Sequence, residues 1–125
     1  MLTGLAPVLL VTDVRVAAEY YRDRLGFDVS YYDALPEHYA YAERDGCEIH
    51  FACFDDAPPR PNVEVVPPDM FDVYVHVADV DALHEELLGR GADLLHGPVE
   101  QPYGLREIRV RDPFGYILAV GEATR

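Results

Sequence analysis

The sequence lacks tryptophan, has only two cysteines and one serine, and carries few basic residues. Its 125 residues include ten Lys plus Arg against 23 Asp plus Glu, which gives a formal net charge of -13. Nucleic-acid-binding proteins use basic residues to neutralise phosphates, so this balance argues against a nucleic-acid partner. An acidic surface suits a cationic ligand, although it also serves solubility alone.

Long apolar runs are also missing. No run approaches the about 20 residues that a membrane-spanning helix needs. The N-terminal residues 1–4 have no basic region before their apolar run, which is unlike a signal peptide. We therefore expect a cytoplasmic protein without a membrane partner.

The two cysteines, Cys47 and Cys53, fall on one expected strand. Six residues of strand span roughly 20 Å, which is beyond the reach of a disulfide. We expect both to be buried, small apolar side chains in a reducing compartment. Ser30, the one serine, has no nucleophile-elbow context, so nothing in the sequence indicates nucleophilic catalysis.

The first half of the chain predicts a strand, a helix and three further strands. Residues 6–11 form an apolar run, and Asp13 is placed to cap a helix that ends at Gly26. Strands are expected over 27–33, 38–44 and 47–54, and Asp45-Gly46 is a strong hairpin signal between the last two. Pro7 favours either an edge position for the first strand or a place at its start.

The second half predicts the same succession. Residues 71–77 form a strand, and a helix runs from Val80 to Leu88 or Arg90 before Gly91. A short strand around Leu94-Leu95 is followed by an expected turn at Gly97-Pro98. Residues 106–120 then form a hairpin around the turn Asp112-Pro113-Phe114-Gly115.

An internal repeat follows from this order. We predict one α+β domain over 1–125, made of two βαβββ modules at 5–54 and 70–122. The linker between them, 55–69, contains five prolines in fifteen residues, which excludes a central strand or a helix.

Strand alternation predicts two faces for each sheet. In the second module Phe71, Val73, Val75 and Val77 are expected under the helix, whereas Asp72, Tyr74 and His76 point away. In the first module the residues expected under the helix are Cys47, Ile49, Phe51 and Cys53. Those expected on the opposite face are Glu48, His50, Ala52 and Phe54. Alternation leaves open whether Tyr39 and Tyr41 or the intervening alanines share that face.

Several motifs resemble the glyoxalase/bleomycin-resistance/extradiol-dioxygenase superfamily, which has the vicinal oxygen chelate fold. They are Leu25-Gly26-Phe27, Ile49-His50-Phe51, Gly104 with Arg106-Glu107, and the Asp112-Pro113-x-Gly115 turn. The resemblance extends from about Leu5 to Glu122. It implies that the polar sheet faces line a cleft, where members of the family bind ligands and metals.

The resemblance also implies four metal-ligand positions, which fall on Ala6, His50, Asp72 and Ala119. Alanine cannot ligate a metal, so His50 and Asp72 would hold a divalent cation only weakly. We therefore expect no metal cofactor, with a weakly held divalent metal as the alternative.

The chain resembles the metal-free, bleomycin-resistance-type branch better than the metal-dependent one. This implies a homodimer that binds a small molecule, such as a cationic or aromatic antibiotic, and favours a protein that is not an enzyme. A metal-dependent lyase or dioxygenase is the alternative, and a structural or regulatory subunit is a third possibility. Family members often carry tryptophan in the ligand groove, and here nine tyrosines stand in for it.

The expected ligand-binding residues are polar or aromatic side chains on the expected cleft face and around the closing hairpin. They are Tyr39, Tyr41, Glu48, His50, Phe54, Asp72, Tyr74, Tyr103 and Arg106. Two alternatives stay open: His50 without a ligand role, and Glu48 and Asp72 in structural ion pairs with Arg106 or Arg109.

Overall fold

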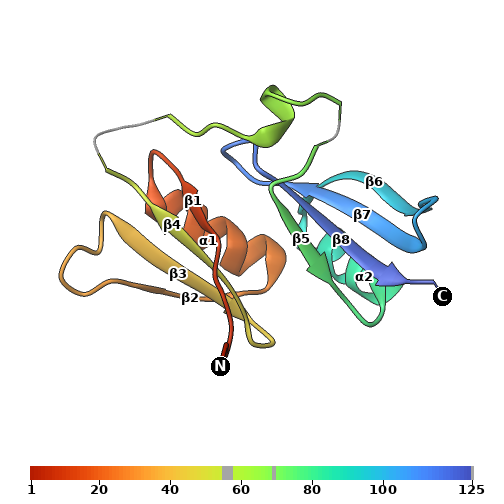
Figure 1. Ribbon diagram of the computed structural model, residues 1–125. Coiled ribbons are helices and arrows are strands. Elements are labelled where there is room, and N and C mark those ends of the chain that lie inside the picture. Colours follow the sequence, from red (N-terminus) through yellow and green to blue (C-terminus); the bar gives the residue numbers. More distant parts are fainter. Residues whose placement is uncertain (55–57, 69, 125) are drawn as a thin grey trace. The chain divides into compact units, whose positions relative to one another are not determined.

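A computed structural model describes residues 1–54, 58–68 and 70–124 (Figure 1). Its internal contacts divide the chain into Met1–Arg60 and Pro61–Arg125, here called unit 1 and unit 2 and described separately. The division falls inside the expected linker 55–69. Residues 55–57 and 69 of that linker lie outside the described residues.

Unit 1 is a four-stranded sheet with one helix. Its elements are β1 (Val8–Leu10), α1 (Val14–Leu25), β2 (Asp28–Tyr31), β3 (Tyr39–Arg44) and β4 (Cys47–Ala52). The strand order is β1-β4-β3-β2. β1 runs parallel to β4, and the other pairs are antiparallel. β1 is an edge strand and begins directly after Pro7, which agrees with both positions that Pro7 favours.

Unit 2 repeats this arrangement after a short 3-10 turn, η1 (Asn62–Glu64). Its elements are β5 (Val73–His76), α2 (Val80–Arg90), β6 (Asp93–Glu100), β7 (Leu105–Arg111) and β8 (Ile117–Ala123). The strand order is β5-β8-β7-β6, with β5 parallel to β8. The prediction of an α+β fold with two βαβββ modules is confirmed.

Both helices begin and end where the sequence predicts. The Asp13 side chain accepts hydrogen bonds from the backbone of Arg15 and Val16, and Asp79 accepts one from Ala82. Gly26 and Gly91 end the helices in the left-handed conformation, with φ of 78° and 77°. Aspartate caps and glycine stops are local signals, and in both units they correctly predict where the helix begins and ends.

The core of unit 1 lies between α1 and the sheet. The Tyr21 ring packs 4.7 Å from that of Phe51, and both side chains are fully buried. Ala40 and Ala42 are also fully buried on this face. The alternation left open by the sequence is thereby decided, since Tyr39 and Tyr41 point to the other side of β3.

The expected turn at Gly97-Pro98 and the expected burial of both cysteines are wrong. Gly97-Pro98 is not a turn, because it lies within the edge strand β6, where the pairing with β7 shifts register on both sides of His96. An edge strand tolerates proline and irregular pairing that a central strand does not. Cys47 is exposed rather than buried, since it opens β4 directly after the hairpin turn, and Cys53 is half-buried.

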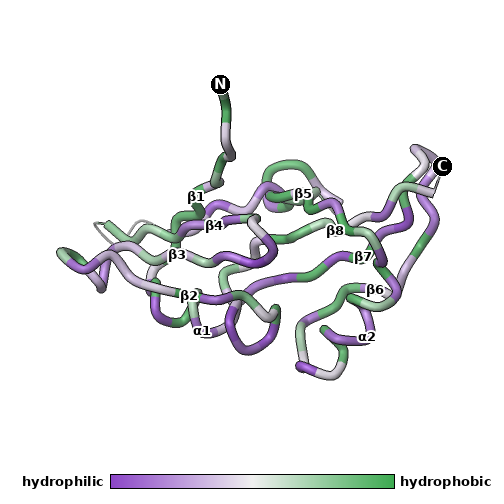
Figure 2. Tube along the Cα trace, turned by 90° about the horizontal axis from the view of Figure 1, so that it is seen from below, coloured by the Kyte–Doolittle hydropathy of each residue, from purple (hydrophilic) through white to green (hydrophobic). Residues whose placement is uncertain are grey.

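The segment before β1 extends away from the sheet of unit 1 and carries hydrophobic positions (Figure 2). Its Met1, Leu2 and Leu5 side chains are exposed. Among the described residues, no helix has the length and apolar character that crossing a bilayer requires.

Candidate functional site

In unit 1, four of the expected ligand-binding residues gather on the sheet face opposite α1. Tyr41 of β3 lies directly across from His50 of β4, and Tyr39 lies two pairs further along on the same face. The His50 ring makes edge-on contacts with both tyrosines, with ring centroids 5.5 Å from Tyr39 and 4.9 Å from Tyr41. We call Tyr39, Tyr41, Glu48 and His50 the aromatic face.

Hydrogen bonds join three members of the aromatic face in a row. The Tyr39 hydroxyl lies 3.0 Å from His50 Nδ1, and His50 Nε2 lies 2.9 Å from Glu48 Oε1. The His50 side chain is 18% exposed and that of Glu48 is 51% exposed. A carboxylate, an imidazole and a phenol in series can orient one another's protons.

Phe54, another expected site residue, follows the end of β4 and is exposed. Its ring stacks on that of His38, with centroids 5.1 Å apart and planes 12° from parallel. His38 Nδ1 donates a 2.7 Å hydrogen bond to the Cys53 carbonyl. The sequence reasoning missed His38 as a site residue; it lies in the turn directly before β3.

In unit 2, the expected residues Tyr74 and Tyr103 converge on Glu107, a carboxylate with no solvent exposure. The Tyr74 hydroxyl donates to Glu107 Oε2 at 2.6 Å, and the Tyr103 hydroxyl donates to Oε1 at 2.8 Å. Arg109 Nη2 donates to Oε1 at 3.0 Å. We call these four residues the Glu107 cluster.

The Glu107 cluster shifts the acidity of its members. Burial alone would raise the pKa of Glu107, but hydrogen bonds from Tyr74, Arg109 and Tyr103 outweigh it and hold that pKa below its ordinary value. Burial, followed by the hydrogen bond to Glu107, raises the pKa of both Tyr74 and Tyr103. The cluster therefore keeps an ionised carboxylate between two neutral phenols.

Phe71 lies against this cluster and not under α2, which corrects the expected face. The Arg109 guanidinium carbon is 5.1 Å from the Phe71 ring centroid, and the Tyr74 ring is 5.5 Å away. Because β5 begins only at Val73, strand alternation does not extend back to Phe71.

Asp72 has a structural task. Its carboxylate accepts a 2.8 Å hydrogen bond from the Asn62 backbone and a 2.9 Å bond from that of Ile117. Within unit 2, the alternative that Asp72 forms an ion pair with Arg106 or Arg109 is wrong, because Asp72 receives backbone groups instead. Glu48, in unit 1, pairs with His50, and its alternative ion pair with an arginine of unit 2 stays a prediction.

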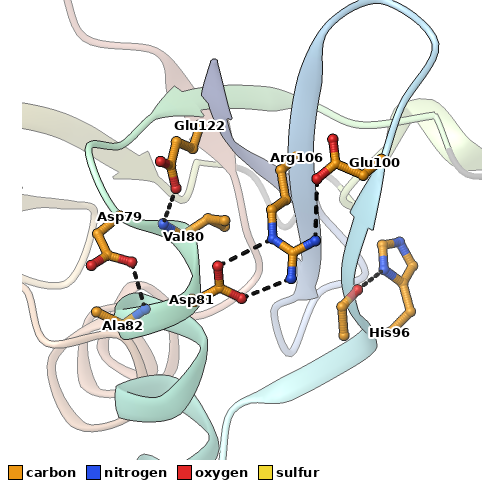
Figure 3. A network of polar contacts seen from close by, with 9 residues as sticks. Asp79, Val80, Asp81, Ala82, His96, Glu100, Arg106 and Glu122 are labelled. Atoms are coloured by element: carbon orange, nitrogen blue, oxygen red, sulfur yellow. Dashed lines mark hydrogen bonds and ion pairs between the residues drawn. The ribbon is translucent and has the colours of Figure 1, made fainter. Parts of the chain in front are cut away.

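Arg106 lies on the side of its sheet that faces α2 (Figure 3). Its guanidinium donates to Asp81 at 2.9 and 3.1 Å and to Glu100 at 3.3 Å. The hydrogen bond from Arg106 lowers the pKa of Asp81. On β7, Glu107 and Arg109 alternate with Arg106, so Arg106 points away from the Glu107 cluster.

Three carboxylates near Arg106 come within 4.8 Å of one another: Asp79, Asp81 and Glu122. Each already has a protein partner, because Asp79 accepts from Ala82, Glu122 accepts from Val80 and Asp81 pairs with Arg106. These contacts, drawn in Figure 3, account for the cluster as the capped start of α2.

The residues at the four metal-ligand positions implied by the family do not fit a metal. Ala6 and the fully buried Ala119 offer no ligand atom. His50 belongs to unit 1 and is bonded to Tyr39 and Glu48, and Asp72 belongs to unit 2 and holds backbone groups.

Comparison with known proteins places the chain in a family. The model of the Glyoxalase/Bleomycin resistance protein/Dioxygenase superfamily matches residues 5–120, so the chain belongs to this superfamily. No curated protein matches the sequence significantly.

Solved structures show the same fold. The bleomycin-binding protein of the bleomycin-producing Streptomyces verticillus, in complex with copper(II)-bleomycin, is 27% identical, with 98% of each chain covered and a TM-score of 0.73. TioX from Micromonospora sp. ML1 is 22% identical over 97% of this chain and 98% of that chain, with a TM-score of 0.74. A superfamily member from Sphaerobacter thermophilus is 19% identical over 98% of both chains, with a TM-score of 0.72.

Proposed function

We propose that this protein binds a small cationic or aromatic molecule without using a metal, and that the ligand is an antibiotic of the bleomycin type. The observation that carries the proposal is the aromatic face of unit 1. There Tyr39 and Tyr41 contact, edge-on, an imidazole that is hydrogen-bonded to the half-exposed Glu48. Such a surface offers ring faces for stacking and a carboxylate for a positive charge.

The similarity to the bleomycin-binding protein supports this ligand class, because it extends over 98% of both chains. The net charge of -13 supports it independently, since a negative surface potential concentrates cations and raises their association rate. Metal-independent binding is supported by the alanines at positions 6 and 119.

Calorimetric titration with copper(II)-bleomycin and with metal-free bleomycin tests the proposal. We expect both forms to bind, and we expect the replacement of both rings in Tyr39→Ala/Tyr41→Ala to weaken binding by about tenfold or more, as lost stacking contacts do. Asp33→Ala, a change in an exposed turn, is the control for surface substitution. The absence of heat with either form at millimolar ligand would overturn the antibiotic assignment.

We further propose that the protein acts as a homodimer with two-fold symmetry, the commonest symmetry of soluble assemblies. Sedimentation equilibrium at tens of micromolar protein measures this directly. A single species with the mass of one chain, 14.1 kDa, would refute it.

A further inference from the structure

We propose that the oxygen of Tyr39 determines ligand specificity on the aromatic face by accepting hydrogen bonds only, so that it selects ligand groups with an N–H. This inference rests on the proposed function and names the chemistry that the site recognises. It follows from which atom carries the hydrogen in each of the two hydrogen bonds that join Glu48, His50 and Tyr39 in a row.

The Glu48 carboxylate determines which atom donates in each of these hydrogen bonds. A carboxylate can accept hydrogen bonds but has none to give, so the 2.9 Å contact with His50 requires the hydrogen to sit on Nε2. A neutral imidazole with its hydrogen on Nε2 keeps a lone pair on Nδ1.

The proton of Tyr39 is fixed in turn. Its hydroxyl lies 3.0 Å from that Nδ1 lone pair, so the phenol donates to the imidazole. The phenol has one hydrogen, and once this is committed the oxygen has only lone pairs left for other partners. A ligand that approaches the Tyr39 oxygen must therefore bring the hydrogen.

The row is held rigidly enough to keep this direction. Tyr41 and His50 are opposite one another in the antiparallel pair β3–β4, and the His50 ring meets the Tyr41 ring at 90°. Tyr39 contacts the same imidazole edge-on, and its ring lies 5.4 Å from that of Tyr41. Rotation of the imidazole would break both hydrogen bonds and both ring contacts.

Unit 2 uses the same device without an imidazole. Both Tyr74 and Tyr103 donate their only hydroxyl hydrogen to the buried Glu107, which has none to return. The positive charge of the Arg109 guanidinium lowers the pKa of Tyr103, but the larger effects of burial and of Glu107 raise that pKa overall.

The ligand groups that fit such an oxygen are ammonium, guanidinium, carboxamide N–H and the N–H of an aromatic ring. Ethers, ketones and carboxylates offer only acceptors and would face the lone pairs of Tyr39. A site built for one hydrogen-bonding partner discriminates strongly against an analogue that lacks it, because a desolvated polar group is then left unpaired.

The first test reads the proton positions directly and needs no ligand. Two-bond ¹H–¹⁵N spectra of the His50 ring distinguish a nitrogen that carries hydrogen from one that carries a lone pair. At neutral pH we expect a protonated Nε2 and a lone-pair Nδ1 in the wild type. Glu48→Ala should release this preference, and Tyr39→Phe should shift only the Nδ1 resonance. Hydrogen on Nδ1 in the wild type would overturn the proposal.

The second test compares two neutral ligands of nearly the same shape. Indole has a ring N–H, and benzofuran has an oxygen in its place, so the comparison excludes net charge. By chemical-shift titration we expect indole to bind about three- to tenfold more tightly, the usual range for one hydrogen bond. Tyr39→Phe should abolish this ratio. Tyr41→Phe, which removes a hydroxyl from the same face outside the row, should preserve it.

Equal affinity of the wild type for indole and benzofuran would overturn the proposal even if copper(II)-bleomycin binds. Conversely, if copper(II)-bleomycin does not bind but the indole preference and its loss in Tyr39→Phe are found, the antibiotic assignment fails and the donor specificity of Tyr39 stands.

Discussion

The hydroxyl of Tyr74 donates a 2.6 Å hydrogen bond to Glu107, a carboxylate that lies on a different strand and has no contact with solvent. Tyr74 belongs to β5 and Glu107 to β7, and β8 runs between them. The phenol reaches across β8 over Gly121, the residue that pairs with Glu107. The hydrogen bond therefore links β5 to β7 across β8, and the missing side chain of Gly121 leaves room for it.

Gly121→Ala should break this connection. A Cβ at Gly121 would overlap the Tyr74 hydroxyl and approach the Glu107 Cγ to 3.3 Å, so the ring must leave its acceptor. We expect a loss of about 1 to 3 kcal/mol in the free energy of unfolding, measured by urea denaturation. Gly89→Ala is the control, because a Cβ there meets nothing within 4 Å and alanine is favoured in a helix. A stable Gly121→Ala protein would show that Tyr74 is not held over this position.

The lowered pKa of Glu107 predicts acid sensitivity. A carboxyl whose pKa is lower in the folded state stabilises the fold above its unfolded pKa, about 4.3, and this stabilisation is lost as the pH falls through the folded value. Glu107→Gln should unfold more easily at neutral pH, by about 3 kcal/mol, because Arg109 is left buried without its anion.

The same variant should show a flatter decline of melting temperature below about pH 4.3 than the wild type, since one titrating group is gone. Glu37→Gln, a change at an exposed position, is the control. Parallel acid limbs for wild type and Glu107→Gln would show that Glu107 does not titrate differently in the two states.

At high pH the tyrosines predict the opposite trend. Burial and Glu107 raise the folded pKa of Tyr74 and Tyr103, so the stability they contribute is complete below about pH 10 and declines as the pH rises further. Tyr74→Phe should reduce this alkaline decline in thermal melts. Tyr32→Phe, at an exposed position, should leave it unchanged, and an unchanged decline in Tyr74→Phe would contradict the prediction.

Local signals in the sequence predicted most of the fold. Asp13 and Asp79 cap their helices, and the Asp45-Gly46 hairpin adopts positive φ at both residues, 53° and 82°. Each of these features depends on neighbours a few residues away, which a single sequence displays. Alternation also placed Glu48 and His50 together, because both lie within one regular strand.

The sequence alone did not predict which side chains from different elements pair with one another. Arg106 pairs with Asp81 and Glu107 with Tyr74 across different elements, and several other carboxylates were equally available on charge alone. The alternation of Glu107 and Arg109 with Ile108 and Val110 did place the first two on the polar face, which is a signal that the sequence reasoning left unused. Phe71 was misplaced because it precedes the regular strand.

The alanines at positions 6 and 119 predict the metal content. We expect protein purified without chelator to contain much less than one zinc, iron, nickel or manganese per chain, as read by elemental analysis. His50→Ala should leave this content unchanged, because a lone imidazole holds these ions weakly. One tightly bound metal per chain, lost in His50→Ala, would restore the metal-dependent lyase or dioxygenase as the better hypothesis.

The charge of the ligand is the last prediction. Benzamidinium and benzoate have nearly the same planar shape and opposite charge. The chain carries -13, and Glu48 beside His50 is half-exposed on the aromatic face. Negative potential and tyrosine rings both favour the cation, and each ring contact contributes on the order of 0.5 to 2 kcal/mol. We expect benzamidinium to bind more tightly in calorimetric titrations and its affinity to fall as salt is added.

Glu48→Gln, which keeps the shape of the side chain, should lower the affinity for benzamidinium and leave the affinity for benzoate unchanged or raised. Asp72→Asn is a test of stability instead, since Asp72 holds two backbone groups. Tighter binding of benzoate, abolished by Arg106→Ala, would identify a site for carboxylate or phosphate metabolites and refute the cationic assignment.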